Sequence, residues 1–449
     1  MKTDVITLTR KQLIRFSIIN KATAGFITVS EAALALGLSE RQIKRLKKDV
    51  KENGAAALVH KNSLRKPTTA ISDAIIAKII ELKSSKPYKN ANFKHFVELL
   101  SEYHDIKLSY SSLHRILVSN GLLSPKTKRR FKPHRRRSRR PQAGLLLQVD
   151  ATAFSWFGGK AKYALHGAID DATGNITALF LSKNECLQGY FEMLRRTIKR
   201  FGVPVSLYAD RHTIFRSPNA DKISIEKQLK GISAKDTQFG RALRELGIQL
   251  IAARSPQAKG RIERLWETLQ SRLPVEFALR NIKSLDQANA FLPAFIENFN
   301  ELFSVIPENL ESAFGSVPKE FDLDLCLCVK DERTLDRGGV FSYYNKYFKI
   351  VDTTYSELIP ANAKVTICVS PVIGIKIKYK QLLFDALRYI KPKKTSAKID
   401  ETEPRIYKPQ APGHCWKNYD KTVPRKSNLE ESDQEIMSML SDIFLKGYA

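Results

Sequence analysis

The chain has few cysteines, and no arrangement of them suggests pairing. Its five cysteines form neither a CxxC motif nor an even-numbered framework: Cys186, Cys326, Cys328, Cys368 and Cys415. We therefore expect free thiols and a reducing compartment. No pair of histidines lies at metal-binding spacing near paired cysteines, so the sequence also argues against a zinc finger.

Long apolar runs and nucleotide-binding loops are absent as well. No segment approaches the roughly 20 consecutive apolar residues of a membrane-spanning helix, and the first residues show no signal peptide. We therefore expect a cytoplasmic protein, and its net charge of +29 favours association with the nucleoid. No GxxxxGKS or GxxxxGKT motif occurs, which argues against ATP-driven movement on DNA. No serine or cysteine nucleophile has a matching base, which disfavours a serine-type recombinase.

Acidic residues are scarce in the first third of the chain. Residues 1–141 hold 31 Lys or Arg against 10 Asp or Glu, which accounts for +21 of the total net charge of +29. This asymmetry indicates a polyanionic partner. Double-stranded DNA fits better than a membrane because no basic amphipathic anchor accompanies the charge. With 449 residues and 43% hydrophobic content, the chain is expected to form several folded domains.

Residues 1–61 are predicted to form a helix-turn-helix DNA-binding domain. An Ala- and Leu-rich helix at 31–36 is followed by a tight turn at 37–39 and a basic helix at 40–50, with Ser39 as its N-cap. In such a motif the second helix enters the major groove of DNA. The predicted DNA contacts on this helix are Arg41, Lys44, Arg45 and Lys48. The alternative is an ordinary helical hairpin with a solvated basic face.

A second helical domain and a basic arm follow. Residues 72–123 are predicted to form a degenerate helix-turn-helix, with helices expected near 74–82, 93–103 and 109–118. Residues 124–141 form the arm, in which ten of the fifteen residues 126–140 are Lys or Arg and prolines keep the chain extended. We expect this arm to follow a DNA phosphate backbone. Its predicted DNA-binding residues are Arg129, Arg130, Arg135, Arg136, Arg137, Arg139 and Arg140.

The pattern of residues 142–305 is that of an α/β domain. A meander of three strands followed by alternating helices and strands is the order of a ribonuclease-H-like core. The strands are expected at 144–150, 162–169, 176–181, 205–209 and 248–253, and the helices at 186–201, 238–246 and from about 256.

Residues 335–392 are predicted to form a small β-barrel because short strands alternate with turns. These strands are expected at 340–343, 347–351, 363–369 and 373–379. The remaining residues, 393–449, are expected to form a flexible tail with a short helix near 429–445.

Three carboxylates of the α/β region are the candidate catalytic residues. Asp150 and Asp210 each follow an apolar strand, and Glu263 lies in an amphipathic helix. Strand ends in one sheet bring such side chains together, and a neighbouring helix adds the third. Hard oxygen donors of this kind suit Mg²⁺, and two such ions about 3.5–4 Å apart hold the attacking and leaving oxygens of a phosphoryl displacement.

Other acidic residues compete for these roles. They are Asp170, Asp171, Asp236, Glu245 and Glu267. The first two lie in the turn between predicted strands and are interpreted as turn residues. Glu267 lies one helical turn beyond Glu263 and is the main rival for the third position.

Two basic side chains lie near the three carboxylates in the sequence. Lys259 shares a helix face with Glu263, so it is predicted to bind a DNA phosphate or to form a salt bridge. His212, two residues after Asp210, is interpreted as structural or supporting rather than as a ligand.

These segments resemble the DDE transposases of bacterial insertion sequences, which have an integrase-type core, and in particular the ISNCY-like group. The similar stretches lie within residues 145–305. They include Gln148-Val149-Asp150, Ala168-Ile169-Asp170-Asp171-Ala172-Thr173-Gly174, Tyr208-Ala209-Asp210-Arg211-His212 and Ser255-Pro256-Gln257-Ala258-Lys259-Gly260-Arg261-Ile262-Glu263-Arg264. One departure is Ala151-Thr152, where this group would have Gly-Ser.

The resemblance implies that Asp150, Asp210 and Glu263 form the catalytic, metal-binding triad. We expect a multidomain protein with N-terminal all-α helix-turn-helix modules, a central α/β ribonuclease-H-like core and a C-terminal small β-barrel. The expected activity is Mg²⁺-dependent cleavage and strand transfer, with two ions and with Mn²⁺ able to substitute.

The expected partners are the terminal inverted repeats and the target DNA, bound by a dimer or higher oligomer. Two alternatives stay open. One is a non-catalytic DNA-binding regulator derived from a transposase, and the other is a structure-selective nuclease of the ribonuclease-H class.

Overall fold

The computed structural model describes seven stretches of the chain: residues 8–59, 70–126, 137–215, 236–253, 259–352, 358–390 and 436–440. The chain divides into two compact units, Met1–Leu82 and Lys83–Ala449, which are described separately below. Part of the predicted basic arm lies outside the described residues, namely Arg129, Arg130, Arg135 and Arg136. The same holds for the predicted tail, apart from a short helical stretch at 436–440.

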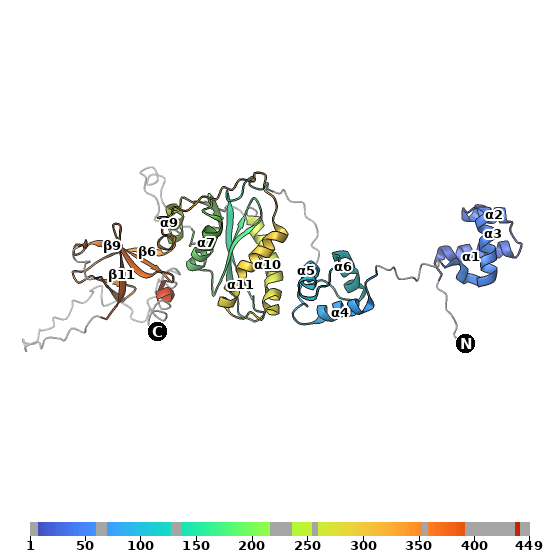
Figure 1. The fold of residues 1–449 in the computed structure, drawn as a ribbon, viewed down its shortest axis with the longest axis horizontal. Helices are drawn as coiled ribbons and strands as arrows, with labels where there is room; N and C mark the ends of the chain where they lie inside the picture. The colour runs from blue at the N-terminus through green and yellow to red at the C-terminus, as the bar shows by residue number, and fades with distance from the viewer. Residues whose placement is uncertain are drawn as a thin grey trace, which may run out of the picture. The chain divides into compact units, whose positions relative to one another are not determined.

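The first unit contains the helix-turn-helix (Figure 1). Its elements are α1 (Arg10–Thr23), α2 (Val29–Leu36), α3 (Glu40–Asn53) and a short 3-10 helix, η1 (Gly54–Leu58). The helices pack around Ile19, Ala32 and Ile43, which are buried. Gly37 ends α2 in the left-handed conformation, with φ of 62°, which suits glycine because it lacks Cβ. Ser39 accepts a backbone N–H from the first turn of α3, so its predicted role as N-cap is confirmed.

Three further helices match those expected between residues 72 and 123. They are α4 (Asp73–Ser84), within which the two units meet in sequence, α5 (Phe93–His104) and α6 (Tyr110–Ser119). Charged side chains of α5 pair with those of α10 (Gly260–Leu279). Arg272 donates to Glu98 at 2.6 Å, and His95 lies 2.7 Å from Glu276. Since three of these four side chains are at most 9% exposed, α5 is firmly attached to this helix.

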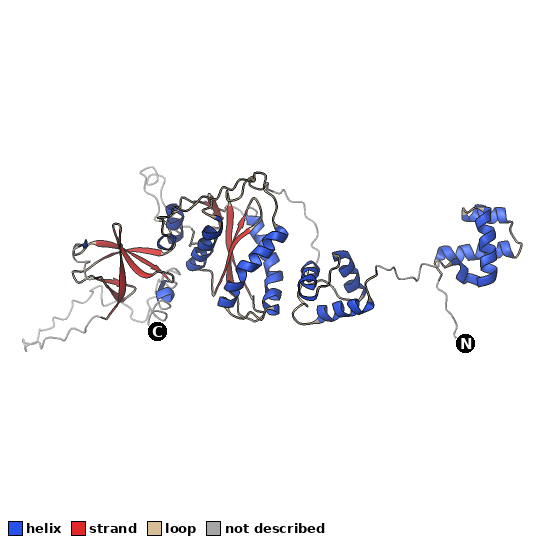
Figure 2. Ribbon diagram, in the orientation of Figure 1, coloured by secondary structure: helices blue, strands red, loops and turns tan. Residues whose placement is uncertain are grey.

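A five-stranded mixed sheet lies at the centre of the second unit (Figure 2). Its strands are β1 (Leu147–Phe154), β2 (Tyr163–Asp170), β3 (Ile176–Ser182), β4 (Ser206–Ala209) and β5 (Gln249–Ala252). The order is β3-β2-β1-β4-β5, with β1 to β3 antiparallel and with β4 and β5 parallel to β1. This is the meander followed by alternating helices and strands that the sequence predicts for the core.

Helices cover both faces of this sheet. One face packs against α7 (Leu187–Phe201) and α9 (Gln238–Glu245), and the other against α10 and α11 (Leu285–Phe303). Successive residues of a strand point to opposite faces. Leu147 and Val149 of β1 therefore join the α7 cluster, while Gln148 and Asp150 bond to residues of α10.

The first core strand differs from its prediction. We expected a strand at 144–150 that ends at Asp150, whereas β1 spans Leu147–Phe154 and Asp150 lies in its middle. Antiparallel pairing with β2 continues as far as Phe154 opposite Tyr163, and this pairing extends the strand. Alanine has a low intrinsic preference for strands, so the Ala-Thr-Ala sequence after Asp150 carries little local signal. By contrast, Asp210 follows β4 directly, as expected.

The C-terminal region forms a six-stranded antiparallel, barrel-like sheet in the order β6-β9-β10-β11-β8-β7. Its strands are β6 (Val329–Thr334), β7 (Val340–Tyr343), β8 (Lys346–Ile350), β9 (Lys364–Ser370), β10 (Gly374–Tyr379) and β11 (Leu382–Tyr389). The prediction missed β6 and β11, and β6 lies before the expected start at 335. Only Val329 of β6 is buried, because this edge strand is dense in charged residues.

A buried histidine of β2 lies against α7. His166 is fully buried and contacts the Tyr190 ring edge-on at 4.8 Å between ring centroids. Its Nε2 accepts the Cys186 backbone N–H at 3.2 Å. A Cβ on Gly189 would lie 2.3 Å from its Cε1, so only glycine fits at this position of α7. Burial lowers the pKa of His166 from 6.5 to about 4, since a charged imidazole would lose its hydration.

This lowered pKa predicts acid sensitivity. Between pH 6.5 and about 4 the unfolded chain binds a proton at His166 that the folded chain does not bind, so the free energy of unfolding falls as the pH falls. The expected loss over this range is roughly 3 kcal/mol. Urea unfolding at a series of pH values measures it. His166→Gln should show a smaller slope over the same range, and an unchanged slope would contradict the assignment.

Candidate active site

The register of two parallel strands brings the first two candidate carboxylates together. Leu147 of β1 is opposite Leu207 of β4, and Gln148 is opposite Tyr208. The same register, continued for two residues, places Asp150 level with Asp210. The two side chains therefore leave neighbouring strands of the sheet at the same height.

One ammonium group lies between these carboxylates. Lys259 Nζ is 2.9 Å from Asp150 Oδ1 and 3.8 Å from Asp210 Oδ2. The lysine side chain is only 9% exposed, so it is almost fully withdrawn from water at the N-terminus of α10. Asp150 is 20% and Asp210 is 43% exposed, which leaves the pair open to solvent on one side. The salt bridge that the sequence offered as one role of Lys259 is therefore present, with Asp150 and Asp210 as its partners.

Each aspartate also has a fixed hydrogen-bond donor on its other oxygen. Trp266 Nε1 donates to Asp150 Oδ2 at 3.0 Å. The backbone N–H of His212 donates to Asp210 Oδ1 at 2.9 Å. One oxygen of each carboxylate is thus held by the protein, while the other faces the shared cation.

Glu263 lies in the first turn of α10 and is exposed. It is four residues after Lys259 and three before Trp266, both of which contact Asp150, so it shares their helix face. Glu267 directly follows Trp266, and a helix turns by about 100° per residue, which directs Glu267 further from β1. The described residues include no three His, Cys, Asp or Glu side chains close enough to hold a metal ion. The structure thus gathers Asp150 and Asp210 but does not draw Glu263 into contact with them.

The remaining competitors have other partners. Asp170 accepts hydrogen bonds from Gly144 and Thr173, which is the turn role predicted for it. Asp236 pairs with Arg244, and Glu245 pairs with Arg241 and Lys330. None of these contacts involves Asp150 or Asp210.

The sequence suggested only a turn role for Asp171, but the structure gives its side chain a further role. Its side chain is fully buried and accepts hydrogen bonds from Gln148, Arg137 and Arg261. Little in the sequence indicated this role, because the arginines that bind Asp171 come from segments far away in the chain. The contact between Trp266 and Asp150 was also not predicted from the sequence.

Glu185, just before α7, adds a further negative charge near the site. Partial burial raises its pKa, and so do the charges of Asp150 and Asp210, while a hydrogen bond from Tyr190 and the proximity of His212 lower it. The Tyr190 hydroxyl donates to Glu185 Oε1 at 2.6 Å. Because the Glu185 carboxylate interacts electrostatically with both aspartates, this region favours the binding of cations.

The predicted DNA-binding residues are found in two places. Arg41, Lys44, Arg45 and Lys48 are exposed along α3, as a recognition helix requires. From the arm, Arg137, Arg139 and Arg140 lie against the core beside Asp171.

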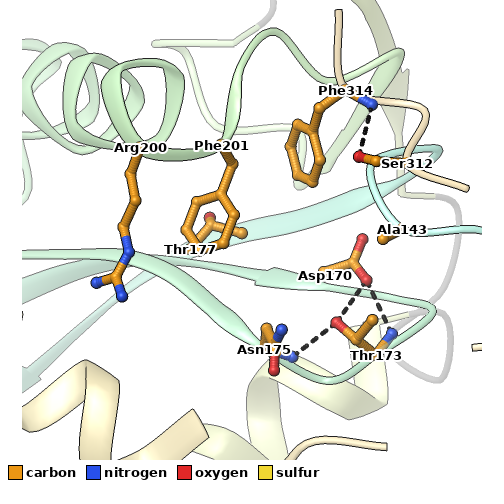
Figure 3. A pocket seen from close by; sticks show the side chains of 9 residues that line it. All are labelled: Ala143, Asp170, Thr173, Asn175, Thr177, Arg200, Phe201, Ser312 and Phe314. Atoms are coloured by element: carbon orange, nitrogen blue, oxygen red, sulfur yellow. Dashed lines mark hydrogen bonds between the residues drawn. The ribbon is translucent and has the colours of Figure 1, made fainter. Parts of the chain in front are cut away.

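A pocket of about 220 Å³ lies at another place on the core (Figure 3). It is lined by Ala143, Asp170, Thr173, Asn175, Thr177, Arg200, Phe201, Ser312 and Phe314. The carboxylate of Asp170 is held there by Thr173, as Figure 3 shows. None of the predicted catalytic residues lines this pocket, so we do not assign the chemistry to it.

Among the helices of the described residues, none combines the length and the apolar character that spanning a membrane requires.

Comparison with known proteins identifies the family. The sequence pattern of a helix-turn-helix domain matches residues 15–68. The transposase for insertion sequence IS1202 of Streptococcus pneumoniae is 34% identical over 368 residues, which cover 74% of this chain and 77% of the relative. The putative transposase y4bF of Sinorhizobium fredii (strain NBRC 101917 / NGR234) is 34% identical over 344 residues, which cover 76% of this chain and 72% of the relative. The chain therefore belongs to the family of insertion-sequence transposases.

Solved structures of integrases are more distant. The catalytic core domain of HTLV-2 integrase in complex with magnesium (dimeric form) is 19% identical, with 33% of this chain and 83% of that chain covered and a TM-score of 0.23. A simian T-cell lymphotropic virus intasome in complex with PP2A regulatory subunit B56 gamma is 16% identical, with 70% and 99% covered and a TM-score of 0.30. Because both TM-scores are low, the family assignment rests on the two transposases.

The packing around Asp150 predicts the effect of a small substitution. Gly167 is opposite Asp150 on β2, and a Cβ there would lie 2.7 Å from Trp266 Cη2 and 2.8 Å from Leu179 Cδ2. Gly167→Ala should therefore displace Trp266 and lower the free energy of unfolding by about 1–3 kcal/mol in urea denaturation.

Gly159→Ala is the matched control, since a Cβ at this position meets no atom within 4 Å. It should change the free energy of unfolding by less than about 0.5 kcal/mol. Equal unfolding midpoints for the two variants would contradict the close packing of Trp266 on β2.

Proposed function

We propose that this transposase is a Mg²⁺-dependent DDE enzyme of the ISNCY-like group, which cleaves DNA at the ends of its element and joins them to target DNA. The observation that carries the proposal is the position of Lys259 Nζ, within 2.9 and 3.8 Å of oxygens of Asp150 and Asp210. A cation already lies between two carboxylates that leave neighbouring strands, which is the charge arrangement that a divalent ion requires.

The donor set fits magnesium. Asp150, Asp210 and Glu263 supply hard carboxylate oxygens, and Trp266 and the His212 N–H hold one oxygen of each aspartate so that the other stays directed at the cation. These three carboxylates are the residues that would hold the magnesium. When bound, Mg²⁺ would activate the attacking oxygen and offset the charge that develops on the phosphate.

The chain's own side chains have separate tasks in this proposal. Asp150 and Asp210 define the position at which the phosphate reacts. Lys259 moves away from these two aspartates and binds a neighbouring DNA phosphate. The reaction is hydrolysis at the element's end, after which the freed 3′-hydroxyl attacks a phosphodiester of the target. No covalent intermediate with the protein is needed, since positioning and electrostatics supply the acceleration.

DNA recognition is assigned to the helical parts. The exposed basic residues of α3 read the terminal inverted repeats in the major groove, and the basic arm binds the adjoining backbone. Two ends have to be joined in one event, so we propose a dimer or higher oligomer on DNA.

Strand transfer from a labelled duplex tests this function. The duplex carries the inverted repeats that flank the gene, and the reaction is run with Mg²⁺ or with EDTA. We expect nicking and joining by the wild type that depends on Mg²⁺. Glu263→Gln keeps the shape of the side chain but removes its charge, and it should reduce the rate by a factor of about 10³ or more because a metal ligand is lost.

Glu267→Gln is the control for the third ligand and should stay within about threefold of the wild type. If Glu267→Gln abolishes joining and Glu263→Gln does not, the assignment of Glu263 is wrong. Tight DNA binding without cleavage by the wild type, with either Mg²⁺ or Mn²⁺, would instead indicate a non-catalytic regulator.

Lys259 also predicts a result that does not depend on activity. Because its ammonium competes with Mg²⁺ for Asp150 and Asp210, Lys259→Met should increase the rise in thermal unfolding temperature that Mg²⁺ produces, by about 2–4 °C relative to the wild type. Lys160→Met, at an exposed lysine, should leave this rise unchanged. A rise that is equal in all three proteins would show that Lys259 does not compete with the ion.

A further inference from the structure

One buried carboxylate connects the basic arm to the helix that carries Glu263. The Asp171 side chain is 0% exposed. Its Oδ1 accepts hydrogen bonds from Gln148 Nε2 at 2.8 Å, from Arg261 Nε at 2.7 Å and from Arg137. Its Oδ2 accepts the backbone N–H of Arg140 at 3.1 Å. Asp171 therefore binds three segments at once: the arm, β1 and the first turn of α10.

Gln148 extends these connections to the candidate active site. Its side-chain Nε2 donates to Asp171, and its Oε1 accepts the backbone N–H of Ile262 at 3.2 Å. Gln148 lies two residues before Asp150, and Ile262 lies directly before Glu263. A single amide group thus sets the first turn of α10 against the strand that carries the first catalytic aspartate.

The arginines around Asp171 carry more positive charge than its single carboxylate neutralises. Arg139 donates to the carbonyl oxygen of Ala172 at 3.0 Å, and its pKa is lowered, chiefly by burial and then by the charge of Arg261, with a further contribution from Arg264. Arg137 and Arg261 each form an ion pair with Asp171. The surplus positive charge suits a polyanion, and DNA phosphates supply the missing negative charge.

We propose that Asp171 is a positioning residue for strand transfer. It holds the arginines at the end of the arm and the first turn of α10 in one arrangement, so that a DNA phosphate bound by the arm lies at a set distance from Asp150 and Glu263. A buried carboxylate that lost its cations would be strongly unfavourable, so neither the arm nor the helix moves away independently. The DNA chemistry in this inference rests on the proposed function, whereas the coupling of arm and helix does not.

The neighbouring aspartate provides the matched control. Asp170 is equally buried, but its oxygens accept hydrogen bonds from uncharged donors, namely the backbone N–H of Gly144 and the N–H and hydroxyl of Thr173. Among the described residues it forms no ion pair with an arginine. Asp171→Asn and Asp170→Asn therefore remove the same charge from adjacent residues. Only the first removes the counter-charge of Arg137 and Arg261. Arg261→Gln adds a third variant, in which Asp171 keeps its charge but loses its partner on α10.

Two measurements on the full chain test the proposal. Amide hydrogen exchange at Ile262, whose backbone N–H donates to Gln148, should become about tenfold faster or more in Asp171→Asn and in Arg261→Gln, because the first turn of α10 loses its attachment. The rate of strand transfer at saturating DNA should fall about tenfold or more in the same two variants, with the half-saturating DNA concentration changed by less than about threefold. Asp170→Asn should stay within about threefold of the wild type in both measurements.

Two results would overturn the positioning role of Asp171. Wild-type exchange and a wild-type saturated rate in Asp171→Asn would overturn the proposal. An equal loss in Asp171→Asn and Asp170→Asn, with the same drop in unfolding temperature, would also overturn it, since Asp171 would then only stabilise the fold. If the wild type itself transfers no strands, the proposed function fails, and the exchange comparison alone supports or overturns the role of Asp171.

Discussion

The candidate site depends on the place of β1 in the sheet, between an antiparallel neighbour and a parallel one. The parallel pairing with β4 sets Asp150 level with Asp210. The antiparallel pairing with β2 puts Gly167 opposite Asp150, and the absence of a side chain there gives the Trp266 ring room to reach Asp150. A shift of one residue in either pairing would turn Asp150 to the other face, away from α10.

Negative charge at two points of the core is compensated by specific basic side chains. Lys259 lies between Asp150 and Asp210, and Arg137 and Arg261 lie on Asp171. The two arrangements differ in exposure. The Asp171 side chain has no exposed surface, so its ion pairs are shielded from water, whereas Asp150 and Asp210 are 20% and 43% exposed. The same charge chemistry is therefore closed to solvent in one place and open to it in the other.

The helix α10 connects the separate parts of the second unit. Its first turn lies at Asp150 and Asp171, its apolar side packs on the sheet together with α11, and its C-terminal half bears Arg272 and Glu276, which pair with α5. Any displacement of α5 or of the basic arm acts on this one helix. Family membership and the helix-turn-helix match give these contacts their meaning, since a transposase has to coordinate DNA binding with chemistry.

The sequence by itself determined the local elements and the residue types of the site. The glycine turn and the Ser39 cap predicted α2 and α3, although α1 was not predicted, and the alternation of strands and helices predicted the order of the core, because these signals act between residues close in the chain. Tertiary structure alone decided the rest: the length of β1, the charged edge strand β6, the Lys259 bridge and the burial of Asp171. The length of β1 is set by its pairing with the neighbouring strand β2, across residues of low strand preference. The other three depend on partners far away in sequence, and backbone pairing or ion pairing over such separations leaves no periodic signal in the chain.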